Sequence, residues 1–106
     1  MSCIEFNGKK IHFFRINGEN WIIVKSVCED LNVDFEHQRR LINDDPILGS
    51  ASHIWMHKID GDDQKRLYFC LREDYVYGWI FSIHSKSENL LTYKRERYNI
   101  LFKALP

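Results

Sequence analysis

Near its N-terminus the sequence reads CIEFNGKKIHFFRINGENWIIV, over residues 3–24. Two Asn-Gly pairs, at residues 7–8 and 17–18, interrupt its apolar and aromatic runs. Asn-Gly readily adopts the two positive φ values of a type I′ turn, whose twist matches that of antiparallel strands. The stretch therefore predicts an antiparallel β-meander of three strands.

Helical signals follow this meander. Ser26 is expected to cap a short helix that Asn32 ends, and Asp34 to cap a second helix that Pro46 closes. Arg39 and Arg40 are expected toward the end of that second helix, where they would complement its dipole. Its inward stripe is predicted to consist of Phe35, Gln38, Leu41 and Ile42.

The second half of the sequence predicts a hairpin and two more helices. The hairpin joins residues 50–59 to residues 66–71 through the turn-forming residues 60–63. Residues 73–83 are apolar almost all round and predict a buried helix that includes Trp79, while Ser87 is expected to cap the last helix. One face of that helix is predicted to carry Leu91, Tyr98, Leu101, Phe102 and Leu105. We therefore predict one α+β domain over residues 1–106, in which the meander and the hairpin pack against four helices.

Composition limits the classes of function. The 106 residues carry 15 basic and 15 acidic side chains, so there is no overall field that would draw the chain to nucleic acid or to an anionic membrane. The apolar run WIIV at residues 21–24 is far shorter than the ~18 residues of a membrane span. Three widely spaced cysteines fit reduced thiols better than a disulfide framework. A cytoplasmic protein without membrane contact is expected.

Catalytic and metal-binding signatures are weak. His53 and His57 lie in HIWMH, which lacks the Glu of the zinc-protease motif and falls in a predicted strand. The acidic residues 60–63 lack the Gly and the Glu that an EF-hand loop needs further along. Cys28 belongs to an apolar stripe, where an inert buried thiol is the usual outcome, and no Gly-rich phosphate loop occurs. We therefore expect no catalytic residues, no metal site and no cofactor, and hence no enzyme.

Two basic segments could contact a partner. Residues 27–41 predict two short helices around a tight turn, and a helix-turn-helix of this kind would present Gln38, Arg39 and Arg40 to DNA. The final helix carries a second basic group, in which Glu96 dilutes the positive field. Either group could be an ordinary solvated helix face, and for the final helix the sequence favours that interpretation over a phosphate-binding track. The basic group on the final helix consists of Lys94, Arg95 and Arg97.

Taken together, these segments resemble one family, the N-terminal domain of temperate-phage antirepressors, which is related to the Bro N-terminal domain. The resemblance extends from Ile4 to about Leu101. Ser26 and Asn32 stand where the family often has Pro and Gly, and Asn tolerates the left-handed conformation that Gly would serve. The motifs that carry the resemblance are FNG at 6–8, NGE at 17–19, VCEDLNVD at 27–34, QR at 38–39, CLR at 70–72, YVYGWIFSI at 75–83 and YKRERY at 93–98.

The resemblance implies a phage or prophage protein in the bacterial cytoplasm that antagonises a phage repressor by binding it, and so favours lytic induction. Because the related Bro domain is associated with DNA binding, a DNA-binding regulator remains the alternative. The neutral charge balance favours the protein partner. Self-association is possible, although no heptad pattern requires it. Many relatives continue into a second, C-terminal domain, so the sequence is either a piece of such a protein or a minimal form of it. The candidate contact surface consists of Glu36, His37, Arg39 and Arg40.

Overall fold

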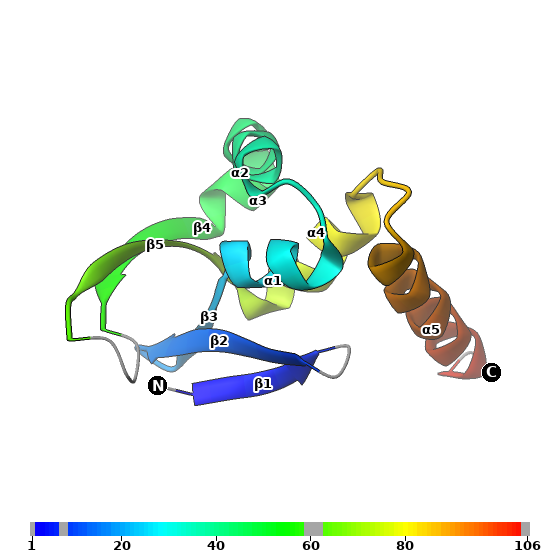
Figure 1. Cartoon of the computed structure of the whole chain (residues 1–106), viewed down its shortest axis with the longest axis horizontal. Coiled ribbons are helices and arrows are strands. Elements are labelled where there is room, and N and C mark those ends of the chain that lie inside the picture. Colours follow the sequence, from blue (N-terminus) through cyan, green and yellow to red (C-terminus); the bar gives the residue numbers. More distant parts are fainter. Residues whose placement is uncertain (1, 7–8, 59–62, 105–106) are drawn as a thin grey trace.

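A computed structural model of the chain describes residues 2–6, 9–58 and 63–104, with side chains for 11–58 and 63–96. Its five-stranded antiparallel sheet has the order β1-β2-β3-β5-β4, and helices lie over one face of the sheet (Figure 1). The strands are β1 (Ser2–Phe6), β2 (Lys9–Ile16), β3 (Glu19–Ile23), β4 (Ser52–His57) and β5 (Arg66–Arg72). The five helices within the described residues are α1 (Val24–Leu31), α2 (Phe35–Asp44), α3 (Pro46–Ser50), α4 (Glu73–Ser82) and α5 (Glu88–Ala104). The predicted α+β class is confirmed.

The predicted meander and hairpin are both present. At the second Asn-Gly pair, Asn17 has φ 52° and Gly18 has φ 81°, the two positive values that a type I′ turn requires. The turn at residues 7–8 lies outside the described residues, as do residues 60–62 of the turn between β4 and β5, but the strands on either side of each turn pair antiparallel. β5 also pairs with β3, which joins the hairpin to the meander.

Alternation along the strands gives the sheet two buried faces. Toward the helices, Ile11, Ile22 and Leu71 enter the main core. The opposite face has a smaller core of Phe14, Ile23 and Cys70. Aromatic side chains cover this second core without any described helix over it, namely Trp21, Trp55 and Tyr68.

Strong curvature of the sheet explains how the second core is closed. The rings of Phe14 on β2 and His57 on β4 stack with centroids 4.2 Å apart. Since β3 and β5 lie between these two strands, the sheet must curl toward this face for the rings to meet. The β4–β5 hairpin therefore folds over the end of β2, as its arched course in Figure 1 shows.

Two helix predictions need correction here. α1 begins at Val24 rather than after Ser26, because Val24 is fully buried and this packing fixes the helix start without a side-chain cap. α2 does end before Pro46, but Pro46 itself opens α3, a fifth helix that the sequence analysis missed. Asp45 caps α3 by accepting hydrogen bonds from the backbone of Ile47 and Leu48 at 2.8 and 2.9 Å.

The helices surround Trp79, the largest fully buried side chain, as predicted for α4. Tyr77 of the same helix is 44% exposed, so the helix is buried on one side and not all round. In α5, the predicted inward residue Leu91 is 38% exposed, whereas Leu90 and Tyr93 are buried. The other four predicted residues of that face lie outside the described side chains.

The start of α5 is anchored to the end of α1. The Ser87 hydroxyl donates a 2.5 Å hydrogen bond to the carbonyl of Leu31, and Asn89 Nδ2 donates to the carbonyl of Asp30 at 2.9 Å. The last carbonyls of a helix lack partners within it, so these side chains satisfy two of them. Ser87 also accepts a long 3.5 Å bond from Leu90 N, consistent with its predicted cap position.

Candidate interaction surface

The pair of helices α1 and α2 meets at the tight turn that the sequence predicts. Asn32 has φ 56° and ψ 49°, the left-handed conformation that ends α1, and Val33 N donates to the Cys28 carbonyl at 2.9 Å. Asp34 then caps α2 by accepting a 2.8 Å bond from His37 N. The turn and the caps thus fix where α2 starts and which of its side chains reach solvent.

Gln38 does not belong to the contact surface. Its side chain is buried, 5% exposed, and its Oε1 accepts a 3.1 Å hydrogen bond from Nε1 of Trp79. The expectation that Gln38 is available to a partner was therefore wrong. Its predicted place on the inward stripe of α2 agrees with the structure. It can be buried there because the indole N–H of Trp79 needs an acceptor and the Gln38 amide supplies one.

The four remaining candidates on α2 are on the surface. Glu36, His37 and Arg40 are exposed, while the Arg39 side chain is 37% exposed and pairs with Glu36 at 2.8 Å. The two arginines lie in the middle of α2, at the fifth and sixth of its ten residues, and not toward its end as predicted. The helix dipole therefore gives no reason for their position.

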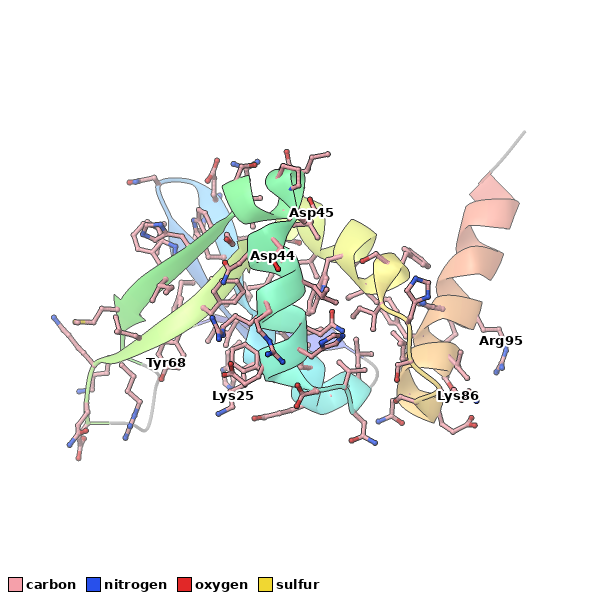
Figure 2. All side chains as sticks on the ribbon, turned by 90° about the horizontal axis from the view of Figure 1, so that it is seen from above. Lys25, Asp44, Asp45, Tyr68, Lys86 and Arg95 are labelled. Atoms are coloured by element: carbon pink, nitrogen blue, oxygen red, sulfur yellow. The ribbon has the colours of Figure 1, made fainter. Side chains whose placement is uncertain are left out.

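The charge of the α2 surface is not basic. α2 and its two capping residues carry carboxylates at positions 34, 36, 44 and 45 against two arginines. Asp44 and Asp45 lie together at the C-terminal end of the helix (Figure 2). Arg39 is paired with Glu36. Arg40 is exposed, and acidic residues precede and follow it along the helix. Such a surface offers phosphate groups little net attraction.

Exposed aliphatic side chains accompany these charges, and the sequence analysis missed them. Leu41 of α2 is 49% exposed and Ile47 of α3 is 64% exposed. Leu41 was expected to point inward, but the interior beneath this part of α2 is filled by Gln38 and Ile42. We call Glu36, His37, Arg39, Arg40, Leu41 and Ile47 together the α2–α3 surface.

The basic group of α5 does not join the α2–α3 surface. α4 lies between the two regions in both views (Figures 1 and 2). Lys94 is half-buried and its Nζ donates to the carbonyl of Ile83 at 2.6 Å, which satisfies an acceptor at the end of α4. Arg95 is exposed and points away from the domain, and the side chain of Arg97 lies outside the described residues. Only Arg95 of this group is thus seen to offer a free surface charge.

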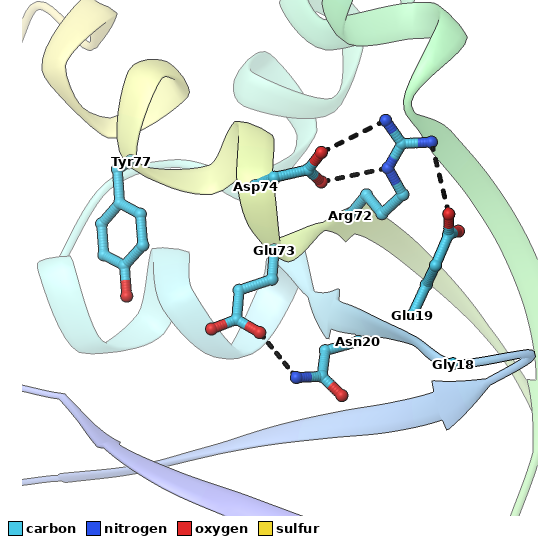
Figure 3. Close-up of a pocket in the computed structure, with 7 residues that line it drawn as sticks. All are labelled: Gly18, Glu19, Asn20, Arg72, Glu73, Asp74 and Tyr77. Atoms are coloured by element: carbon cyan, nitrogen blue, oxygen red, sulfur yellow. Dashed lines mark hydrogen bonds and ion pairs between the residues drawn. The ribbon is translucent and has the colours of Figure 1, made fainter.

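A cleft of about 410 Å³ lies where β3, β5 and α4 meet (Figure 3). Asp74 receives two hydrogen bonds from Arg72, at 3.0 and 3.3 Å, and these bonds hold the pKa of Arg72 above its usual value. Glu19 lies 3.8 Å from the same guanidinium, and Glu73 accepts a 2.7 Å bond from Asn20. Each carboxylate in the cleft has a partner, so these groups tie the strand ends to α4.

The two cysteines with described side chains are buried. Burial raises the pKa of the Cys28 thiol to about 12, with smaller contributions from Asp34 and Glu29, and burial also raises the pKa of Cys70 to about 12. A nucleophilic cysteine needs the opposite shift. Across the described residues, no three His, Cys, Asp or Glu side chains come together as a metal-binding group. His53 and His57 are exposed on β4, as predicted for strand histidines.

The structure is thus a small α+β domain in which the helices α1 and α2 resemble a helix-turn-helix and the α2–α3 surface is exposed. A family model, the P22_AR N-terminal domain, matches residues 2–105, so the chain belongs to this family of antirepressor N-terminal domains. Searches among curated proteins and among solved structures find no significant match. Membership makes the chain a phage antirepressor-like regulatory domain whose partner is a repressor or another regulatory molecule. Within the described part of the chain, no helix is long and apolar enough to cross a membrane.

Proposed function

We propose that this chain antagonises a phage repressor by binding it directly, and that this favours lytic induction in the cytoplasm of the bacterial host. The observation that carries the proposal is the α2–α3 surface, where Leu41 and Ile47 are exposed on the same two consecutive helices as side chains of both charges. Apolar centres with polar rims are typical of protein interfaces. The family supplies the regulatory context, since its antirepressor role requires a repressor or regulatory partner.

A direct test uses the purified chain and the repressor encoded in the same phage genome. We expect calorimetric binding that changes little between about 0.05 and about 0.3 M salt, because exposed apolar contacts are insensitive to screening. Leu41→Lys should weaken binding at least about tenfold, since it places an unpaired charge in the contact area. Leu91→Lys is the matched control, because Leu91 is 38% exposed on α5, away from the α2–α3 surface, and its variant should bind normally.

DNA binding through α1 and α2 is the second candidate. The left-handed turn at Asn32 and the exposed Arg40 favour it, because they give a helix pair with a basic side chain on the second helix. Burial of Gln38 and the pairing of Arg39 with Glu36 remove two of the three side chains that would contact DNA. The protein partner is therefore the better supported of the two.

The DNA candidate has its own test. The chain and its Arg39→Ala, Arg40→Ala double variant are titrated against non-specific duplex DNA at low and moderate salt, after circular dichroism has shown both to be folded. Binding that is steeply salt-dependent and needs both arginines would establish a phosphate contact on α2. Lack of binding at low salt, together with capture of the repressor, is the result that we expect.

A further inference from the structure

The outer edge of the sheet at β4 is open. β4 is the last strand of the order β1-β2-β3-β5-β4, and among the described residues only β5 pairs with it. Alternate residues of an antiparallel strand direct their N–H and C=O groups to opposite sides. One side of β4 is therefore satisfied by β5, and the other presents a row of backbone donors and acceptors to the surroundings.

This edge lacks the features that normally prevent pairing. The sequence has no Asp, Glu, Lys or Arg between Asp45 and Lys58, so no charged side chain interrupts β4. On its convex face, Ile54 is 57% exposed and Met56 is 61% exposed, and Leu67, opposite Met56 on β5, is 65% exposed. Soluble proteins usually place lysine, proline or a bulge at such an edge. The hairpin is instead an exposed apolar face beside an open row of hydrogen-bonding groups.

The β4 edge is complementary to itself. In an antiparallel pairing related by a two-fold axis, each residue faces one that is an even number of positions away, whichever the register. Ile54 and Met56 of one copy must then fall on the same face as Ile54 and Met56 of the other. The aromatic face is matched in the same way, because Trp55 of one copy falls on the same face as Trp55 of the other. No register places a charged side chain within the paired Ser52–His57 segments.

We propose that β4 pairs with β4 of a second copy, so that two sheets join into one across a two-fold axis. A second copy fits better than a charged partner because β4 carries no formal charge and the chain has a formal net charge of zero, so two copies do not repel each other. Across the joined sheet, Ile54 and Met56 of one copy would pack beside Ile54 and Met56 of the other. This pairing is independent of the proposed function.

Sedimentation velocity over about 1 µM to about 1 mM tests the proposal, a range that covers ordinary weak and moderate affinities. We expect a species of twice the 12.8 kDa chain mass that becomes dominant as concentration rises. Ile54→Lys should weaken this dimer at least about tenfold, because it places like charges close together at the paired edge. Leu91→Lys is the matched control, since Leu91 is 38% exposed on α5, on the other side of the domain from β4 (Figure 1), and the same substitution there should leave the dimer unchanged.

Circular dichroism checks that both variants are folded. We expect them to fold because both substitutions replace side chains that already face solvent. A monomer throughout the concentration range overturns the proposal. A dimer that both variants disrupt, or that neither disrupts, also overturns it, because the interface then lies elsewhere. A monomer that loses repressor binding through Ile54→Lys would show that the edge accepts a strand of the repressor instead. Repressor binding without dimerisation thus refutes the β4 dimer and leaves the proposed function intact. Dimerisation through β4 without repressor binding would support the dimer and refute the proposed function.

Discussion

Two tryptophans on opposite faces of the sheet allow a matched test of the hydrogen bond between Trp79 and Gln38. Trp79 is fully buried and donates to Gln38 at 3.1 Å, whereas the Nε1 of Trp55 is buried with no hydrogen-bond partner in the structure. Replacing either residue with Phe removes the same atoms. Only at position 79 does the change leave a buried amide without its partner.

The magnitudes follow from these contacts. Trp79→Phe leaves the buried Gln38 amide without its hydrogen-bond donor, which should lower the free energy of unfolding by roughly 1–3 kcal/mol. The smaller ring also leaves a void, worth about 1 kcal/mol more, so a loss of about 2–4 kcal/mol is expected. Trp55→Phe also loses ring contacts, at a partly exposed site, which lowers the free energy of unfolding. It removes a buried N–H without a partner, which raises that free energy, so the net change should be within about 1 kcal/mol.

Urea unfolding followed by far-UV circular dichroism measures both variants without relying on tryptophan fluorescence. The double variant Gln38→Leu, Trp79→Phe should be less destabilised than the sum of its two single changes, by about 1 kcal/mol, because both polar partners are then gone. The reasoning is refuted if Trp79→Phe costs no more than Trp55→Phe. Additive single and double changes would also show that the two side chains are not coupled.

Other predictions concern the turn, the cap and the thiols. Asp34→Ala should lower the free energy of unfolding by about 1 kcal/mol through loss of the α2 cap, and an unchanged urea midpoint would argue against that bond. Asn32→Gly should be tolerated while Asn32→Val costs at least about 1 kcal/mol, because only the first suits φ 56°; equal stability of the two variants would contradict the turn geometry. The thiols of Cys28 and Cys70 should resist a thiol reagent until the domain unfolds, and prompt labelling at either of these two positions in the folded chain, located by peptide mass spectrometry so that Cys3 is counted separately, would exclude their burial. Their pKa values are raised from 9.0 to about 12, so the folded state holds these protons more tightly. The contribution of the two thiols to the free energy of unfolding should therefore be constant below about pH 9 and fall between pH 9 and pH 12, which a comparison with the Cys28→Ala, Cys70→Ala variant isolates; a contribution that rises over that range would reverse the sign.

The sequence predicts the strands well because their signals are local. Each Asn-Gly pair specifies a turn, and period-two alternation on either side determines which residues share a face. The left-handed Asn32 and the Asp34 cap were also predictable, since each depends on a single residue and its neighbours. Local chemistry of this kind needs no knowledge of the rest of the fold.

The parts that were missed depend on contacts between distant residues. Gln38 looks like a surface residue until Trp79, far along the chain, is brought to it as a hydrogen-bond donor. The start of α1 at Val24 and the exposure of Leu41 likewise follow from packing that no short window contains. Pro46 carried a signal for a new helix, because proline is favoured at the first helical position and Asp45 precedes it as a cap.

The curvature of the sheet could not be read from the strands either. Only the stacking of His57 on Phe14 shows that the hairpin folds toward β2. This curvature builds the second core from aromatic residues and turns Ile54 and Met56 outward on the convex face. The exposed β4 edge is therefore a property of the assembled sheet.

We propose above that this domain acts by binding a repressor through the α2–α3 surface. The most direct measurement is calorimetric titration of the repressor from the same phage genome with the native chain, the Leu41→Lys variant and the Leu91→Lys control. If the proposal holds, the native chain and the control bind, Leu41→Lys binds at least about tenfold more weakly, and the affinity changes little with salt. Undiminished binding by Leu41→Lys, or a repressor that is ignored while duplex DNA is bound in a strongly salt-dependent way, would contradict it.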